Sequence, residues 1–361
     1  MSKSVYIHIP FCKAICSYCD FCKMLYNENF ALDYLIALEK EIIEKYDSQL
    51  IETIYIGGGT PSSLKITELK KLFNIIKLFK FDKEYEFTFE INLDDIREEL
   101  LEILKENKVN RLSIGIQSFD KNNLEFLKRD SDFKDAKAKI SLCRKYGFGN
   151  LSVDLMYAIP GQTMSMLKKD IKKFKKLKTE HISTYSLIIE DHTAIKINNT
   201  EYIDESLDAK MYKCITKSLK RNKLNKYEVS NFSKTGYESK HNLVYWNNEE
   251  YFGFGLGAAG YYDGVRYENT RGLTDYLSGN FTLEKNFISK KENMDNELML
   301  GFRKTDGINI NTFKNKFGKE LLEVYDLNGF IKEKILIIKG NNIMVNPKSM
   351  YLLNEILIKI I

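Results

Sequence analysis

Over the first half of this sequence the hydrophobic pattern changes its period again and again. Short runs rich in β-branched and aromatic residues predict buried strands, and longer stretches with apolar residues every three or four positions predict amphipathic helices. The predicted strands lie at residues 5–9, 52–56, 84–90, 111–116, 151–157 and 181–187, and the predicted helices lie at 30–46, 67–79, 96–106, 133–146 and 164–177.

Strands that alternate with helices in this way predict an α/β fold with a parallel sheet, because each helix serves as a crossover connection between neighbouring strands. The periodicity does not distinguish an open sheet from one that curls into a barrel. In both architectures ligands bind at the carboxyl ends of the strands. We therefore search for chemistry in the residues that end each strand.

In the remainder of the chain the regular alternation of strands and helices ends. A helix follows residue 206, a stretch rich in glycine and aromatic residues continues to residue 276, and helices mix with strands after residue 285. Helices at 293–302 and 310–317 and a strand pair at 335–345 predict a small winged-helix-like α+β unit. We expect two domains, residues 1–280 and 285–361.

Composition excludes several classes of protein. Lys and Arg total 55 against 50 for Asp and Glu, and the lysines are scattered over helix faces, so no nucleic-acid partner is expected. No apolar run is long enough to span a bilayer, and the amino terminus lacks the pattern of a signal peptide. The expected location is the cytoplasm.

Four cysteines crowd into the segment directly after the first predicted strand. Cys12, Cys16 and Cys19 have the spacing CxxxCxxC, and Cys22 follows three residues later. In a reducing compartment such a cluster indicates metal or redox chemistry rather than disulfides. Three thiolates on a [4Fe–4S] cluster leave one iron open to a further ligand. The alternative is a structural zinc site, although zinc sites favour two CxxC pairs.

The segment YIHIPFCKAICSYCDFC resembles the radical S-adenosylmethionine (SAM) superfamily. Within it the chain is similar, over almost its whole length, to the oxygen-independent coproporphyrinogen III oxidases and to the related HemW-type haem chaperones. The resemblance implies a partial (βα)6 barrel with a [4Fe–4S] cluster on Cys12, Cys16 and Cys19. SAM would bind the open iron and be cleaved to a radical on reduction. Because a fourth thiolate would close that position, we expect Cys22 not to be a ligand.

The resemblance also implies a set of SAM-binding residues. The motif GGGTP ends the second predicted strand, polar residues end later ones, and Asp154 is an acid inside an apolar run. The implied SAM contacts are Tyr6, Tyr18, Gly58, Gly59, Thr60, Glu90, Gln117, Arg129, Asp154 and Ile188. Surface ion pairing is the alternative for Arg129 and Asp154, and plain core packing is the alternative for Tyr6, Tyr18 and Ile188.

The segment HNLVYW begins at His241 and resembles the haem chaperones rather than the oxidases. An imidazole beside two aromatic side chains could ligate or flank a porphyrin, so His241 is a candidate haem ligand. The alternative is a hydrogen-bonded histidine that closes the barrel.

Two functional classes compete, an oxidase of coproporphyrinogen III and a haem chaperone. The chain starts only five residues before Tyr6 and so lacks the extension found in the oxidases. Together with HNLVYW this favours a chaperone that binds haem and passes it to acceptor haemoproteins. The resemblance suggests acceptors among respiratory enzymes, peripheral membrane association, and an electron donor for the cluster. The oxidase, and another radical enzyme such as a methyltransferase, remain alternatives.

Overall fold

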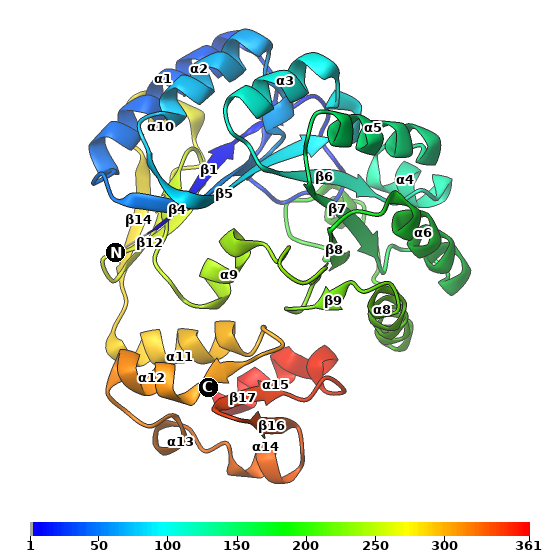
Figure 1. The fold of residues 1–361 in the computed structure, drawn as a ribbon, viewed down its shortest axis with the longest axis vertical. Helices are drawn as coiled ribbons and strands as arrows, with labels where there is room; N and C mark the ends of the chain where they lie inside the picture. The colour runs from blue at the N-terminus through cyan, green and yellow to red at the C-terminus, as the bar shows by residue number, and fades with distance from the viewer. Residues whose placement is uncertain (1–2) are drawn as a thin grey trace.

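The structure, a computed structural model, describes residues 3–361 and is built around one curved nine-stranded sheet (Figure 1). Its strand order is β11-β1-β4-β5-β6-β7-β8-β10-β9. Six consecutive neighbours are parallel and coincide with the six predicted strands: β1 (Ser4–Ile9), β4 (Leu50–Gly58), β5 (Lys80–Asn92), β6 (Arg111–Gln117), β7 (Asn150–Tyr157) and β8 (His181–Ser186).

The sheet stays open, because its two edges do not pair with each other. Strand β11 (Phe252–Phe254) adds parallel to β1 at one edge, while β10 (Asn231–Ser233) and β9 (Asn225–Lys226) add antiparallel beyond β8. The predicted α/β architecture and its partial (βα)6 barrel are therefore confirmed, and three strands that the sequence did not predict extend the sheet.

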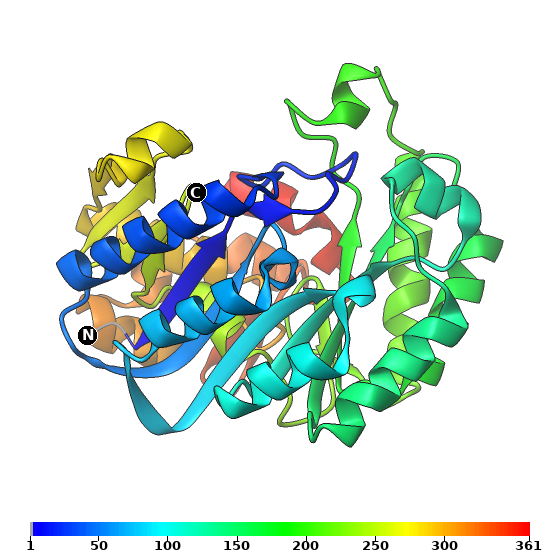
Figure 2. The same cartoon turned by 90° about the horizontal axis from the view of Figure 1, so that it is seen from above.

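The crossover helices cover the outer face of the sheet (Figures 1 and 2). They are α1 (Glu28–Lys45), α2 (Ile66–Ile76), α3 (Glu98–Glu106), α5 (Phe133–Lys145) and α6 (Met164–Leu177), with the short α4 (Lys121–Leu127) before α5 and α8 (Glu205–Lys220) after β8. Outward-facing residues such as Ile54, Phe87, Leu112 and Val153 are almost fully buried against these helices and form the main core.

The inner face of the sheet is polar instead. Adjacent strands place Tyr55, Thr88 and Arg111 side by side in one register layer. Two residues further along β5 and β6, the next layer of side chains on the inner face contains Glu90, Ser113, Ser152 and His181. Because side chains alternate between the two faces of a strand, the apolar core outside and the polar lining inside come from the same six strands. Functional side chains therefore have an enclosed polar surface on which to gather.

The chain after β8 folds over this inner face and then leaves the sheet. It includes α7 (Ala194–Ile197), α9 (Lys240–Trp246) and a three-stranded antiparallel sheet of β12 (Ala259–Tyr262), β13 (Val265–Asn269) and β14 (Thr282–Phe287), with α10 (Leu273–Leu277) between the last two. Figure 1 shows α9 between the curved sheet and the C-terminal helices.

The C-terminal segment is a small α+β unit with its own hydrophobic core, as predicted. It consists of α11 (Lys290–Gly301), β15 (Ile308–Asn309), α12 (Ile310–Phe317), α13 (Leu321–Val324), α14 (Asn328–Lys332), β16 (Leu336–Lys339), β17 (Asn342–Val345) and α15 (Leu353–Ile360). Strand β14 runs across the predicted boundary at 280–285, and the division into two domains stays a prediction. Within residues 3–361, no helix combines the length and apolarity needed to cross a membrane.

Candidate functional site

The cysteine segment is a loop closed at its base by two short parallel strands, β2 (Phe11–Cys12) and β3 (Met24–Leu25). It follows directly on β1, so it lies at the carboxyl end of the sheet. Ser17 fixes the loop from the side, since its hydroxyl donates to the Phe126 carbonyl at 2.7 Å and its own carbonyl accepts from the Ile195 amide at 3.2 Å. The loop is therefore held by segments that follow β6 and β8.

Three of the four loop cysteines, Cys12, Cys16 and Cys19, are close enough to act on one another electrostatically. Burial raises the pKa of the Cys12 thiol to about 11, and the nearby Cys19 and Cys16 thiols add to that rise. The Thr60 hydroxyl lies 3.7 Å from Cys12 Sγ, and Arg129 Nη1 lies 3.7 Å from Cys16 Sγ. Each donor is placed to stabilise a thiolate, which is the form of cysteine that binds iron.

Cys22 has different neighbours. Burial raises the pKa of its thiol, and the charged groups that act on it are Arg271, Lys23 and Glu268 rather than the other cysteines. A Cβ atom placed on Gly257 would lie 3.0 Å from Cys22 Sγ, so this thiol lies against the glycine-rich segment between β11 and β12. The arrangement favours three cluster ligands over four.

The donor chemistry of the loop fits a [4Fe–4S] cluster, since Cys12, Cys16 and Cys19 are free thiols and hydrogen-bond donors lie beside two of them. Within residues 3–361, no three Cys, His, Asp or Glu side chains are already gathered at metal-binding distance.

The glycine turn at the end of β4 lies beside the loop. Gly58 has φ +113°, and a Cβ atom there would lie 2.6 Å from the His8 ring, so only glycine fits. Its amide donates to Glu90 Oε2 at 3.1 Å, while the Tyr55 hydroxyl donates to Glu90 Oε1 at 2.6 Å. Burial raises the pKa of Glu90 to about 7, although both hydrogen bonds oppose the rise.

The next two residues of the turn join it to the cysteine segment. The Gly59 amide donates to the Ile9 carbonyl and the Thr60 amide to the Phe11 carbonyl, both at 2.8 Å. Predicted residues of the GGGTP motif therefore lie directly against the start of the cysteine loop.

Arg129 reaches the same place from the segment that follows α4. Its guanidinium donates from Nη1 to Asn92 Oδ1 and from Nη2 to the Gly115 carbonyl, both at 3.0 Å, and it borders Cys16. These contacts place the guanidinium beside the cysteine loop rather than in a surface ion pair, and its contact with SAM stays a prediction.

Gln117 and Asp154 lie on the strands next to it. Gln117 has φ +71°, and its buried Oε1 has no hydrogen-bond partner within residues 3–361, so it can accept from a ligand hydroxyl. Burial raises the pKa of Asp154 to about 6, while the Ser183 hydroxyl, Arg111 and Arg129 act against the rise. An unpaired acceptor and a buried acid beside the cysteine loop fit a polar cofactor.

The remaining predicted contacts differ in how they are placed. The Tyr6 hydroxyl lies 2.9 Å from His8 Nδ1, and His8 Nε2 lies 2.6 Å from the Cys22 carbonyl oxygen. Tyr18 packs on the small apolar cluster that contains Leu127. Ile188 is 60% exposed just after β8, so the core-packing alternative for this residue is wrong.

His241 lies on α9 and is 1% exposed. Its Nδ1 is 2.8 Å from the Thr53 hydroxyl and its Nε2 is 2.8 Å from the Tyr245 hydroxyl. Burial and the positive charge of Arg111 lower its pKa to about 3, so the ring is neutral. Both nitrogens are thus engaged, and iron ligation by His241 would require one of these hydrogen bonds to break. Its role as a haem ligand stays a prediction.

Sequence reasoning missed Arg111, which occupies the middle of the polar inner face. The residue is 2% exposed, its Nε has no partner within residues 3–361, and its charge acts on Glu90, Asp154 and two buried histidines. The signal was present, because Arg111 interrupts the apolar strand RLSIGI as Asp154 interrupts its own. The same signal marks His8 in YIHIP.

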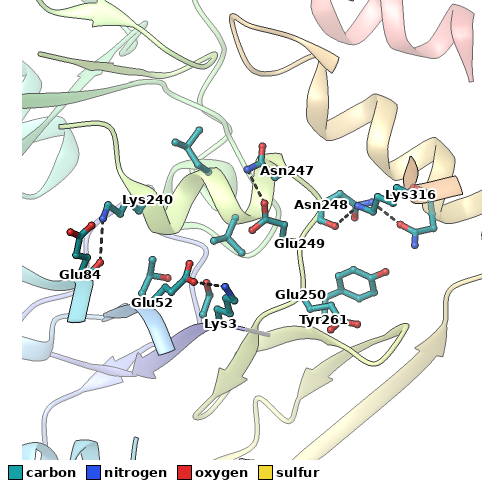
Figure 3. A pocket seen from close by; sticks show the side chains of 15 residues that line it. Lys3, Glu52, Glu84, Lys240, Asn247, Asn248, Glu249, Glu250, Tyr261 and Lys316 are labelled. Atoms are coloured by element: carbon teal, nitrogen blue, oxygen red, sulfur yellow. Dashed lines mark hydrogen bonds and ion pairs between the residues drawn. The ribbon is translucent and has the colours of Figure 1, made fainter. Parts of the chain in front are cut away.

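A cavity of about 830 Å³ lies between α9, the amino ends of the parallel strands and the C-terminal unit (Figure 3). Three lysines line it, but each is already paired. Lys3 bonds to Glu52 at 2.5 Å, and the ammonium group of Lys240 donates to the Glu84 carbonyl at 3.3 Å. Lys316 pairs with Glu297 at 2.7 Å. The lining also contains Glu52, Glu84, Glu249 and Glu250, so the cavity offers an anionic ligand little net positive charge.

Comparison with known proteins agrees with this geometry. The radical SAM superfamily matches residues 6–174, and the HemN C-terminal domain family matches residues 288–352. The solved structure of coproporphyrinogen III oxidase (HemN) from Escherichia coli, a radical SAM enzyme, superposes with a TM-score of 0.87 over 98% of this chain and 89% of that one. Its sequence identity is 19%, so this likeness concerns the fold.

Curated relatives are closer in sequence. Heme chaperone HemW of Lactococcus lactis is 38% identical over 98% of this chain and 96% of its own length. Heme chaperone HemW of Bacillus subtilis is 41% identical over 88% of both chains. With the cysteine loop, the glycine turn and the polar strand ends in one place, these matches show that the chain belongs to the HemW family of radical SAM proteins.

Proposed function

We propose that this protein binds haem and transfers it to acceptor haemoproteins. The observation that carries the proposal is the similarity over almost the full length to proteins named heme chaperone HemW. The oxidase alternative has weaker support, because the likeness to HemN is one of fold at 19% identity.

Membership of the radical SAM superfamily implies a [4Fe–4S] cluster and SAM. We assign the cluster to Cys12, Cys16 and Cys19, which have the CxxxCxxC spacing and act on one another electrostatically. We assign the SAM contacts to the residues around that loop: Tyr6, Tyr18, Gly58, Gly59, Thr60, Glu90, Gln117, Arg129, Asp154 and Ile188. When bound, the cluster would supply the electron that cleaves SAM, and the protein would hold the cluster and SAM next to each other.

The cellular setting belongs to the same proposal. A haem carrier of this kind needs haem as cargo, acceptor proteins and an electron donor for its cluster. We place the protein in the cytoplasm, where respiratory enzymes at the membrane are candidate acceptors that it would meet by peripheral association.

The test is a binding and transfer experiment on the anaerobically reconstituted protein. We expect haem to bind with micromolar or better affinity, to pass to an apo-haemoprotein, and coproporphyrinogen III to remain unchanged under reducing conditions with SAM. Absorption spectra and product analysis measure these outcomes. Decarboxylation of coproporphyrinogen III without haem binding would favour the oxidase.

The variant His241→Ala separates the two roles of this residue. A changed haem spectrum would identify His241 as an iron ligand. An unchanged spectrum with retained binding would leave the imidazole in its hydrogen bonds to Thr53 and Tyr245.

A further inference from the structure

His8 lies near the end of β1, just before the cysteine segment begins. Its neighbours Ile7 and Ile9 belong to the main core on the outer face of the sheet, so the imidazole between them points to the inner face. The residue is 3% exposed. A buried imidazole therefore lies among the residues that we assign to the cofactors.

This imidazole connects separate parts of the site. Its Nε2 lies 2.6 Å from the carbonyl oxygen of Cys22, at the far end of the cysteine segment, and its Nδ1 lies 2.9 Å from the Tyr6 hydroxyl. The ring also occupies the space beside Gly58, where a Cβ atom would come within 2.6 Å of it. One side chain therefore joins β1, the cysteine segment and the glycine turn.

The partners of His8 fix its tautomer. A carbonyl oxygen only accepts, so Nε2 carries the hydrogen and donates to Cys22. Burial lowers the pKa of His8 to about 4, the hydrogen bond to Cys22 opposes the fall and the charge of Arg271 adds to it, so Nδ1 has no hydrogen at neutral pH. Burial also raises the pKa of Tyr6 well above its usual range. The Tyr6 hydroxyl therefore donates its hydrogen to Nδ1, and its oxygen presents only lone pairs to other groups.

We propose that His8 is a positioning residue with two tasks: its Nε2–H holds the end of the cysteine segment against β1, and its Nδ1 orients the Tyr6 hydroxyl as an acceptor for SAM. The second task rests on the proposed function, in which Tyr6 contacts SAM. An acceptor suits this cofactor, because its amino group donates hydrogen bonds and its sulfonium is positive. Residues behind a metal site commonly orient its ligands in this way, and their loss costs roughly 10- to 100-fold in affinity.

Two substitutions of His8 separate the tasks. The amide nitrogen of glutamine can replace Nε2 as a donor, and the amide oxygen of asparagine can replace Nδ1 as an acceptor. His8→Gln should therefore keep the hydrogen bond to Cys22 and lose the one to Tyr6, while His8→Asn should do the reverse. Tyr6→Phe removes the hydroxyl alone.

The matched control is His181→Asn. His181 is also fully buried, and its Nδ1 and Nε2 lie 2.8 Å from the hydroxyls of Ser152 and Tyr227. These partners lie on β7 and directly after β9 rather than in the cysteine segment. The control therefore removes a buried histidine with two hydrogen bonds, at a place where neither task is performed.

Hydrogen exchange of residues 10–26 is measured in the cluster-free full-length proteins, and iron release to a chelator and SAM affinity are measured after anaerobic reconstitution. We expect His8→Asn to exchange this segment and to release iron roughly tenfold faster than the wild-type protein, while His8→Gln and Tyr6→Phe stay close to it. SAM affinity should fall roughly tenfold in His8→Gln and in Tyr6→Phe.

Wild-type exchange and iron release in His8→Asn would overturn the first task, and wild-type SAM affinity in Tyr6→Phe would overturn the second. Equal changes in His181→Asn would reduce both effects to a general loss of stability and overturn the proposal. If the reconstituted wild-type protein fails to bind SAM, the proposed cofactor assignment is refuted instead, and exchange in the cluster-free proteins still decides the first task.

Discussion

At the scale of single residues, the surroundings of the four loop cysteines predict different results for their removal. Changing Cys12, Cys16 or Cys19 to Ala should abolish a stable cluster. Cys22→Ser should retain about four irons per chain, because its thiol faces Gly257 and Arg271 instead of the other cysteines. Anaerobic reconstitution with iron counting and Mössbauer spectra measures this. Loss of the cluster in Cys22→Ser would make it a fourth ligand.

Arg129 allows a second test at this scale. Arg129→Ala should weaken SAM binding roughly ten- to hundredfold, which is the loss expected for a charged hydrogen bond, and should leave iron content unchanged. Arg97→Ala is the control, because Arg97 is partly exposed and its guanidinium contacts only the Asp95 carbonyl at 3.3 Å and Glu99 at 3.9 Å within residues 3–361. Anaerobic titration calorimetry gives both affinities. Unaltered SAM binding would remove Arg129 from the site, and a loss of iron would show that it supports the cysteine loop.

At the scale of elements, α9 depends on one buried carboxylate. Glu86 of β5 accepts hydrogen bonds from the Lys240 and His241 amides, both at 3.1 Å, and thereby satisfies the start of the helix. Glu86→Gln should lower the free energy of unfolding by roughly 1–2 kcal/mol and speed hydrogen exchange in α9. Glu84→Gln is the control, since only the main-chain carbonyl of Glu84 bonds to Lys240. Equal exchange in both variants would contradict this role.

At the scale of the whole molecule, buried ionisable groups set opposing pH trends in stability. Burial raises the pKa of Glu90 and Glu228 to about 7 and that of Asp154 to about 6. Because these folded-state values exceed the unfolded ones, each carboxyl lowers stability as pH rises from about 4 to its folded pKa. Burial lowers the pKa of His8 to about 4 and of His241 to about 3, so these groups raise stability between those values and about 6.5.

Glu228→Gln isolates one carboxyl from this balance. The variant should match the wild-type protein near pH 4.5, where both side chains are neutral, and exceed its free energy of unfolding by roughly 1–3 kcal/mol at pH 7.5. Urea unfolding at the two pH values measures the difference. Equal stability at pH 7.5 would show that Lys226 and Arg303, which lie near Glu228, compensate its charge fully.

The sequence by itself determined the features that depend on local pattern. Changes of hydrophobic period predicted all six parallel strands, since burial of alternate or consecutive residues is a property of each segment. Predicted bounds such as 84–90 were short, because β5 extends from Lys80 to Asn92 through a bulge that its pairing with β4 creates. The cysteine spacing, the glycine turn and the acid inside a strand could also be recognised as functional candidates in the sequence, because each departs from the composition of an ordinary apolar core.

Only the tertiary structure decided which of these residues meet. Arg129 lies beside Cys16 and His241 beside Thr53 because separate strands and helices pack together, and no local pattern encodes such pairings. The same packing left the sheet open, added β11 beside β1, set Cys22 against Gly257 and buried Arg111 on the polar face. Long-range contacts depend on the register between strands, which the whole chain fixes at once.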